Sequence, residues 1–182
     1  MKLLACIFGL SMLLIAAPPV PSAAATSTST TQPAAPTIAD SKGDFTITIP
    51  PSWKQGKLKP GREGLLVMGP PPRGTRAYPM FQAQRGLRDG DADKPLDETV
   101  NGIVEQFTKR PASETTISKA RLDGVEARYF RVTLDVDGKP VDFDYVVAIN
   151  KGQLFSLNFM QQQAHFDADA AKRVFDSFRW SK

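Results

Sequence analysis

The sequence predicts an α+β domain in which a mainly antiparallel sheet of about six to seven strands is flanked by two principal helices. In the second half of the chain, alternating apolar and polar runs are joined by two-residue turns that favour β-hairpins, at Asp123-Gly124, Asp137-Gly138 and Lys151-Gly152. Two other stretches, about 95–109 and 166–180, repeat apolar residues at helical spacing. Because each helix must bury its apolar side, we expect both helices to pack on the sheet as an α/β/α sandwich.

The first strand is expected at 45–49, where Phe45, Ile47 and Ile49 alternate with threonines as in a half-buried strand. The two prolines that follow lack an N–H donor, so the strand ends there. Two further strands are expected at 64–68 and 80–85, on either side of a proline-rich loop.

The first helix is expected over about 95–109. Pro95 suits its first turn, and the acidic side chains of Asp97 and Glu98 complement the positive end of the helix dipole. The hairpin pattern then predicts strands at 115–122, 125–136, 139–150 and 153–160. The last helix is expected to turn its apolar side inward, with Ala170, Ala171, Val174, Phe175 and Phe178.

Residues 1–25 have the pattern of a secretory signal peptide. Lys2 precedes an apolar run that is shorter than the roughly 20 residues of a membrane-spanning helix, and small residues form a cleavage site near Ala25. Cleavage would give an exported protein, periplasmic or secreted, without a transmembrane span; an uncleaved anchor is the alternative. The only cysteine, Cys6, lies in this segment, so the mature protein would have no disulfide. We expect a flexible Ser/Thr/Pro/Ala linker over 26–43 and the folded domain over 44–182.

Basic residues are concentrated in one part of the chain. The stretch 54–88 has eight basic residues and one acidic residue, whereas the formal net charge of the whole chain is +4, which is too small to indicate nucleic acid binding. We therefore expect an anionic partner, either an envelope protein or an anionic surface, to bind at Lys54, Lys57, Lys59, Arg62, Arg73 and Arg76. Ordinary solvated charge is the alternative interpretation.

Trp53 follows the first strand closely and has two interpretations: a ligand platform or a part of the core. The chain ends with three more aromatic residues, Phe175, Phe178 and Trp180. Rings from both ends of the domain would close one hydrophobic core, and burying each is worth roughly 2–3 kcal/mol. We therefore expect all four aromatic residues to be structural.

The sequence offers few residues for catalysis or metal binding. Asp142 and Asp144 are spaced like a glycosidase pair, but alternation on an exposed patch of the sheet explains them better. His165 is the only histidine, and the sequence contains no nucleophile motif such as Gly-x-Ser-x-Gly that it could activate. We interpret it as an exposed or capping residue near the last helix. The acidic stretch 89–93 starts like a calcium loop but lacks the glycine and glutamate that such a loop needs. We expect no catalytic residue, no metal site and no cofactor.

Four segments resemble the PsbP-like family: the opening FTITIPPSW, the helix LDETVNGIVEQF, the strand pair LDGVEARYFRVTL and the terminal FDSFRW. This group includes the extrinsic photosystem II subunit, the Ran-binding Mog proteins, and bacterial envelope proteins of the DcrB-like and LpqN-like types. The resemblance covers about 44–180 and implies an antiparallel sheet between helices, with a non-enzymatic accessory or binding role. Its motifs are structural, so it assigns no functional residue.

We therefore expect a non-catalytic exported accessory or binding protein of the bacterial cell envelope that acts through contacts with a protein or an anionic ligand. One alternative is a periplasmic hydrolase built on Asp142 and Asp144 or on His165. The other is a surface-adhering module that works through the basic residues.

Overall fold

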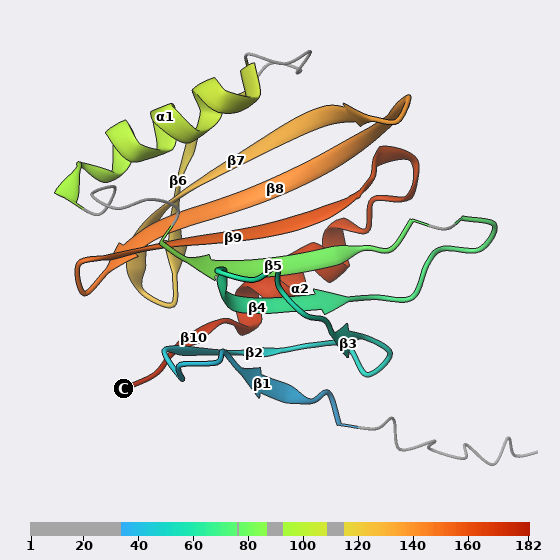
Figure 1. Cartoon of the computed structure of the whole chain (residues 1–182), viewed down its shortest axis with the longest axis horizontal. Helices are drawn as coiled ribbons and strands as arrows, with labels where there is room; N and C mark the ends of the chain where they lie inside the picture. Colours follow the sequence, from blue (N-terminus) through green and yellow to red (C-terminus); the bar gives the residue numbers. More distant parts are fainter. Residues whose placement is uncertain (1–33, 76, 87–92, 109–114) are drawn as a thin grey trace, which may run out of the picture. The chain divides into compact units, whose positions relative to one another are not determined.

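The structure is a computed structural model that describes residues 34–75, 77–86, 93–108 and 115–182. The expected signal peptide, the first part of the expected linker, Arg76 and most of the acidic stretch 89–93 lie outside the described residues. The described residues form two antiparallel sheets and two α-helices (Figure 1), which confirms the predicted α+β class.

The larger sheet has seven strands, and its order differs from the order of the sequence because β9 inserts between β5 and β8. From one edge to the other the strands are β3 (Lys54–Gln55), β4 (Glu63–Met68), β5 (Met80–Arg85), β9 (Gln153–Gln162), β8 (Lys139–Asn150), β7 (Val125–Val136) and β6 (Ser118–Leu122). The smaller sheet has three strands, β1 (Thr37–Ala39), β2 (Phe45–Thr48) and β10 (Arg179–Trp180), with β2 in the centre.

The three predicted hairpin turns are confirmed. Both residues of each turn have positive φ: 45° and 84° at Asp123-Gly124, 55° and 74° at Asp137-Gly138, and 49° and 71° at Lys151-Gly152. Positive φ at both central residues matches the right-handed twist of the flanking strands, which is why glycine occupies the second position. Strands β7 and β8 therefore begin and end at the predicted residues.

Helix α1 (Leu96–Thr108) packs on β7 and β8, on one face of the larger sheet (Figure 1). Val100 of α1 is fully buried among Phe130, Val132 and Val147 of these strands. The first turn of α1 is held by Asp97, whose carboxylate accepts two hydrogen bonds from Arg128 of β7, at 2.5 and 3.1 Å. This hydrogen bonding holds the pKa of Asp97 below its usual range.

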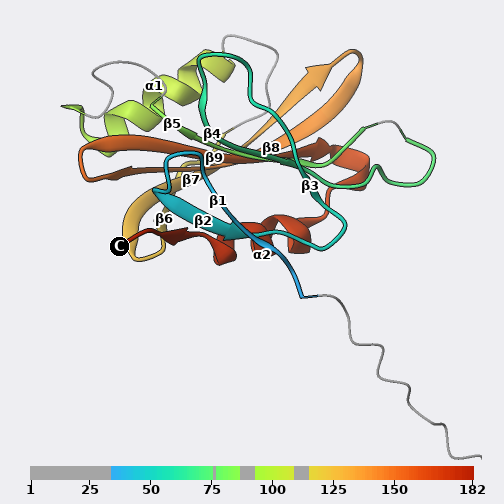
Figure 2. The same ribbon diagram turned by 60° about the horizontal axis from the view of Figure 1, so that its bottom comes forward.

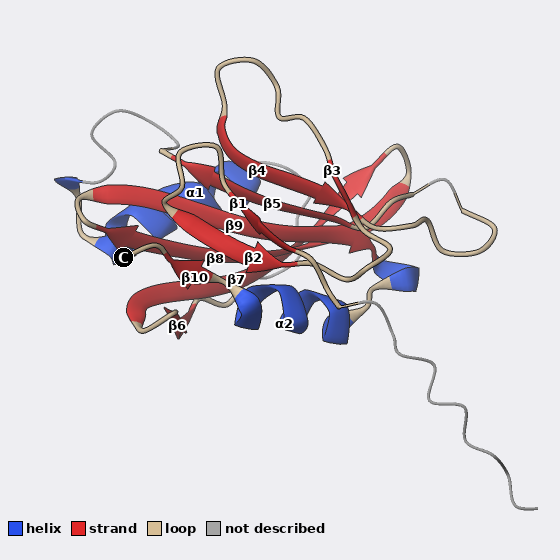
Figure 3. Cartoon of the chain, turned by 90° about the horizontal axis from the view of Figure 1, so that it is seen from below, coloured by secondary structure: helices blue, strands red, loops and turns tan. Residues whose placement is uncertain are grey.

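Helix α2 (Ala168–Ser177) and the smaller sheet lie on the other face of the larger sheet (Figure 3). The helix begins at Asp167, whose side chain accepts a hydrogen bond from the backbone N–H of Ala170 at 2.8 Å. The core on this face contains Phe45, Phe159 and Phe178, all fully buried. This core joins α2, β2 and the larger sheet.

Three details of the fold differ from the sequence-based expectation. Thr37–Ala39 was expected in the linker but pairs with β2 as strand β1. Asp40 closes the turn between the two strands, because its carboxylate accepts hydrogen bonds from the backbone N–H groups of Asp44 (2.6 Å) and Phe45 (3.2 Å). The strand at Phe45 belongs to the smaller sheet and not to the larger one. The last helix ends at Ser177, and Arg179–Trp180 pairs with β2. Strands of two or three residues are too short to show a hydrophobic period, so composition alone did not indicate them.

Within the described ranges, neither helix is long and apolar enough to cross a lipid bilayer.

Candidate functional site

A cavity of about 590 Å³ lies on the α1 side of the larger sheet, between α1, the loop that joins β3 to β4, and the strands β4, β5 and β9. It exists because, among the described residues, α1 packs mainly on β7 and β8 and leaves part of the neighbouring strands uncovered. Figure 2 shows the β3–β4 loop rising on the same side of the sheet as α1. We call this cavity the basic cleft.

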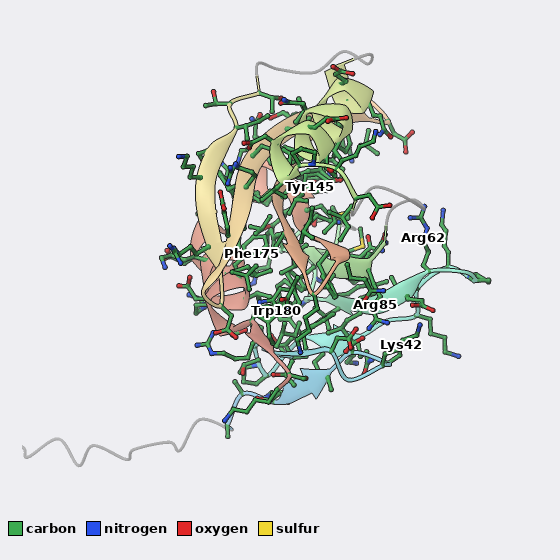
Figure 4. All side chains as sticks on the ribbon, turned by 90° about the vertical axis from the view of Figure 1, so that its left-hand side faces the viewer. Lys42, Arg62, Arg85, Tyr145, Phe175 and Trp180 are labelled. Carbon is green, nitrogen blue, oxygen red and sulfur yellow. The ribbon has the colours of Figure 1, made fainter. Side chains whose placement is uncertain are left out.

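Three basic side chains stand on the β3–β4 loop at the edge of the basic cleft: Lys57, Lys59 and Arg62. All three are exposed. The guanidinium of Arg62, which Figure 4 labels, donates a hydrogen bond to the side-chain carbonyl of Gln84 at 3.2 Å. This bond ties the loop to the sheet. Among the described residues, no carboxylate lies within the 4.0 Å ion-pair distance of these three groups. Their charge is therefore available to an anion.

The floor of the basic cleft is polar. Gln82 and Gln84 of β5 stand opposite Asn158 and Ser156 of β9 in the strand register. Asn158 is only 6% exposed, and its side-chain oxygen Oδ1 has no hydrogen-bond partner among the described residues. Leaving a buried acceptor unpaired costs about 1–3 kcal/mol and calls for an explanation, and this one belongs to a residue that lines the cleft.

The wall of the basic cleft is apolar and aromatic. It is formed by Ile103 and Phe107 of α1 and by Tyr145 of β8. Figure 4 labels Tyr145. The ring of Tyr145 stacks on Phe130 with a centroid distance of 4.9 Å and lies 5.3 Å from the ring of Phe107. Burial raises the pKa of Tyr145 to about 12, so its hydroxyl stays protonated at neutral pH and can donate a hydrogen bond.

Alkaline titration tests the burial of this ring and of a second tyrosine. Burial, followed by a hydrogen bond to Asp144, also raises the pKa of Tyr129 to about 12. In the unfolded chain the two hydroxyls lose their protons near pH 10. Their contribution to the free energy of unfolding is therefore complete below about pH 10 and is lost between about pH 10 and 12. We expect Tyr145 to contribute about 2–3 kcal/mol of this loss. The phenolate absorbance of the folded protein should show that two of the three tyrosines lose their protons well above pH 10. A single transition near pH 10 would contradict the packing.

The other predicted binding residues are not part of the basic cleft. Lys54 is exposed on β3, and Arg73 is exposed on the loop before β5. Neither lines the cleft, and Arg76 lies outside the described residues. The structure thus brings together three of the six predicted basic residues. The polar floor was missed because a glutamine or asparagine that alternates with apolar residues looks like the solvent-facing side of a strand.

The expected exposed patch at Asp142 and Asp144 is wrong: both residues are buried, at 4% exposure each. They lie on the α2 side of β8. Asp144 accepts hydrogen bonds from Arg131, at 2.6 and 2.9 Å, and from the hydroxyl of Tyr129, at 2.8 Å. Asp142 accepts a hydrogen bond from the hydroxyl of Thr133 at 2.7 Å. Partners on the neighbouring strand β7 allow these carboxylates to be buried, and the sequence spacing alone did not indicate them.

His165 is exposed in a short 3₁₀ turn before α2. The nearby Asp167 is the N-cap of α2, so its carboxylate is engaged by the helix backbone. Over the described residues, no group of three or more His, Cys, Asp or Glu side chains could hold a metal ion.

Trp53 lies inside the core. It is 8% exposed and packs against Phe159, with the ring centroids 5.9 Å apart. Gly69 lies against the indole, where an added Cβ would approach within 2.6 Å. Phe178 is fully buried in the same cluster, and Phe175 and Trp180 pack against it partly buried. These rings pack in or against the core of the fold.

Comparison with known proteins identifies the fold. No family model and no curated protein matches the chain. Among solved structures, the chain is similar to LpqN of Mycobacterium tuberculosis, described as involved in cell envelope biogenesis, with a TM-score of 0.56 and 15% identity over 81% of this chain and 86% of LpqN. It is also similar to the cyanobacterial PsbP protein CyanoP of Synechocystis, with a TM-score of 0.52 and 14% identity over 81% of this chain and 93% of CyanoP.

A Bacteroides thetaiotaomicron protein matches with a TM-score of 0.54 and 12% identity over 80% of this chain; the chain spans about half, 48%, of that protein. The chain therefore has the PsbP-like, LpqN-like fold, which confirms the resemblance inferred from its sequence.

Proposed function

We propose that this protein is a non-catalytic exported accessory or binding protein of the bacterial cell envelope that takes an anionic ligand in the basic cleft. One observation supports the proposal. Among the described residues, the same cavity is lined by cations that form no ion pair and by a buried oxygen that accepts no hydrogen bond. Lys57, Lys59 and Arg62 supply positive charge, and Asn158 supplies an oxygen that needs a donor. The volume of about 590 Å³ is within the range of small-molecule sites.

The composition of the basic cleft favours binding over catalysis. Among the described residues that line it there is no carboxylate, histidine or cysteine. Hydrolysis needs a general base or an activated nucleophile, and the available groups are amides, hydroxyls and cations. These groups can recognise an anion through charge and hydrogen bonds.

Two observations support a place in the cell envelope. The pattern of residues 1–25 favours export. The fold is shared with LpqN, which is described as involved in cell envelope biogenesis.

The test uses an anionic fluorescent probe, anilinonaphthalene sulfonate. We expect it to bind the purified protein, and Lys57→Glu with Lys59→Glu to weaken binding by about tenfold or more, which corresponds to about 1.4 kcal/mol. The control is Lys172→Glu with Arg173→Glu, which changes the charge equally on the exposed side of α2, on the other face of the sheet. We expect the control to bind as tightly as the wild type.

An equal loss in both double variants would show that the probe responds to net charge alone and would overturn the basic cleft as a site. Binding to anionic lipid vesicles that depends on Lys54 and Arg73 would instead favour the surface-adhering module, because these two residues lie outside the cleft.

A further inference from the structure

A second cavity, of about 860 Å³, adjoins the basic cleft. The two cavities share two lining residues, Met80 of β5 and Met160 of β9, which stand opposite each other in the strand register. The second cavity continues along the same strands toward the β7–β8 hairpin, where it is lined by Val136, Val141 and Phe143. The two cavities therefore adjoin at this methionine pair, and together we call them the groove.

The floor of this groove changes from polar to apolar along the strand direction. Gln84 faces Ser156, then Gln82 faces Asn158, and then Met80 faces Met160. On the neighbouring strand β8, Phe143 stands beside Met160. At a rise of about 3.3 Å per residue, roughly 13 Å separates the first polar pair from the methionine pair.

The far end of the groove exposes apolar side chains to solvent. Two large hydrophobic residues are exposed among the described residues, Tyr78 at 52% and Val136 at 44%. Both line the second cavity. Exposed apolar side chains that gather around a hollow mark a surface that an apolar group can cover.

Polar residues of the second cavity do not supply a second anion site. Asp137, Lys139 and His165 are exposed, and a carboxylate accompanies the two groups that can carry positive charge. Gln161 is buried, but its side-chain carbonyl already accepts a hydrogen bond from the backbone N–H of Asp167 at 3.0 Å. Because Asp137 offsets Lys139, the net positive charge of the described lining residues is larger at the other end of the groove, at Lys57, Lys59 and Arg62.

We propose that the groove binds a single-chain anionic amphiphile, with its head group at Lys57, Lys59 and Arg62 and its alkyl chain across Met80 and Met160 into the second cavity. This inference rests on the proposed anion site of the basic cleft. The three cations attract the head group, and the amide floor supplies hydrogen bonds to its oxygens and hydroxyls. Methionine is flexible and polarizable, so the shared pair can adapt to a passing chain.

The test compares three probes by calorimetric titration of the purified protein: dodecyl phosphate below its micelle concentration, ethyl phosphate and neutral dodecyl maltoside. We expect dodecyl phosphate to bind with one molecule per protein and at least about a hundredfold more tightly than ethyl phosphate, because each buried methylene adds affinity. Dodecyl maltoside should bind at least about tenfold more weakly than dodecyl phosphate, because it lacks the charge.

Two variants separate the ends of the groove. The double variant Tyr78→Ser with Val136→Ser changes two exposed positions. It should weaken the binding of dodecyl phosphate by about tenfold and leave the binding of ethyl phosphate unchanged. Lys57→Glu with Lys59→Glu should weaken both phosphates. Lys172→Glu with Arg173→Glu is the charge control and should weaken neither.

The methyl NMR signals of Met80 and Met160 give a readout that is independent of affinity. They should shift on addition of dodecyl phosphate and stay unchanged with ethyl phosphate. Equal affinity for the two phosphates would overturn the amphiphile and leave the anion site intact. Dodecyl maltoside binding as tightly as dodecyl phosphate would overturn the role of the cations in this inference, and failure of both phosphates to bind would overturn the anion site itself.

Discussion

Replacing Phe178 by alanine is expected to lower the free energy of unfolding by about 3–5 kcal/mol, as measured by urea denaturation. Phe178 is fully buried where α2 ends. Its ring stacks on Phe45 of β2 with a centroid distance of 5.0 Å and meets the edge of Trp180 of β10 at 4.7 Å. The substitution removes one of the contacts that join the end of the last helix to the smaller sheet and leaves a cavity between them. Since the only cysteine lies in the expected signal peptide, no disulfide would offset the loss.

Two other substitutions serve as controls. Phe178→Leu keeps most of the buried volume and should cost less than about 2 kcal/mol. Phe175→Ala truncates a neighbouring ring that is only partly buried, so it should cost less than Phe178→Ala. A loss below about 1 kcal/mol in Phe178→Ala would contradict the packing of the smaller sheet on the core.

The sequence predicted correctly those strands that have a long run of alternating apolar and polar residues or that end at a defined turn. Strands β7 and β8 have twelve residues each, and their turns contain glycine at a position that requires positive φ. Pairing between distant segments could not be predicted, because nothing in Phe45–Thr48 indicates that its neighbours are Thr37–Ala39 and Arg179–Trp180. These partners are chosen by tertiary packing, which a local pattern does not report.

The candidate site could be predicted only by its charge. Clustered basic residues in the sequence pointed to Lys57, Lys59 and Arg62, which do gather at one cavity. The cavity itself depends on how far α1 reaches across the sheet, and this is set by packing against β7 and β8. The prediction for Asp144 was wrong, because the alternating pattern indicated an exposed carboxylate. Asp144 is buried, since Arg131 on the next strand balances its charge and Tyr129 donates a hydrogen bond to it.

An ion network around Arg85 supports the end of strand β5. The side chain of Arg85, which Figure 4 labels, stands at the end of β5 and is 7% exposed. It forms ion pairs with Asp40, Asp44 and Glu63. The carboxylate of Asp40 is 2% exposed and lies 3.4 Å from Arg85. This network fixes the turn between β1 and β2 to the larger sheet.

Replacing Arg85 by methionine is expected to lower the free energy of unfolding by about 3–4 kcal/mol, because methionine fills part of the space but leaves the buried charge of Asp40 without its cation. Glu63→Gln is the matched control in the same network; its side chain is 47% exposed, so it should cost less than about 1 kcal/mol. Urea denaturation measures both variants.

A double-mutant cycle identifies the cause of the loss. If the cost of Arg85→Met comes from the uncompensated carboxylate, then adding Asp40→Asn should recover part of it, so that the double variant loses about 1–2 kcal/mol less than the sum of the single variants. Strict additivity would mean that Arg85 stabilises the protein through its packing on the ring of Phe155, which lies 5.9 Å from the guanidinium carbon. Arg85 does not line the basic cleft, so probe binding by the folded Arg85→Met variant should match that of the wild type in either case.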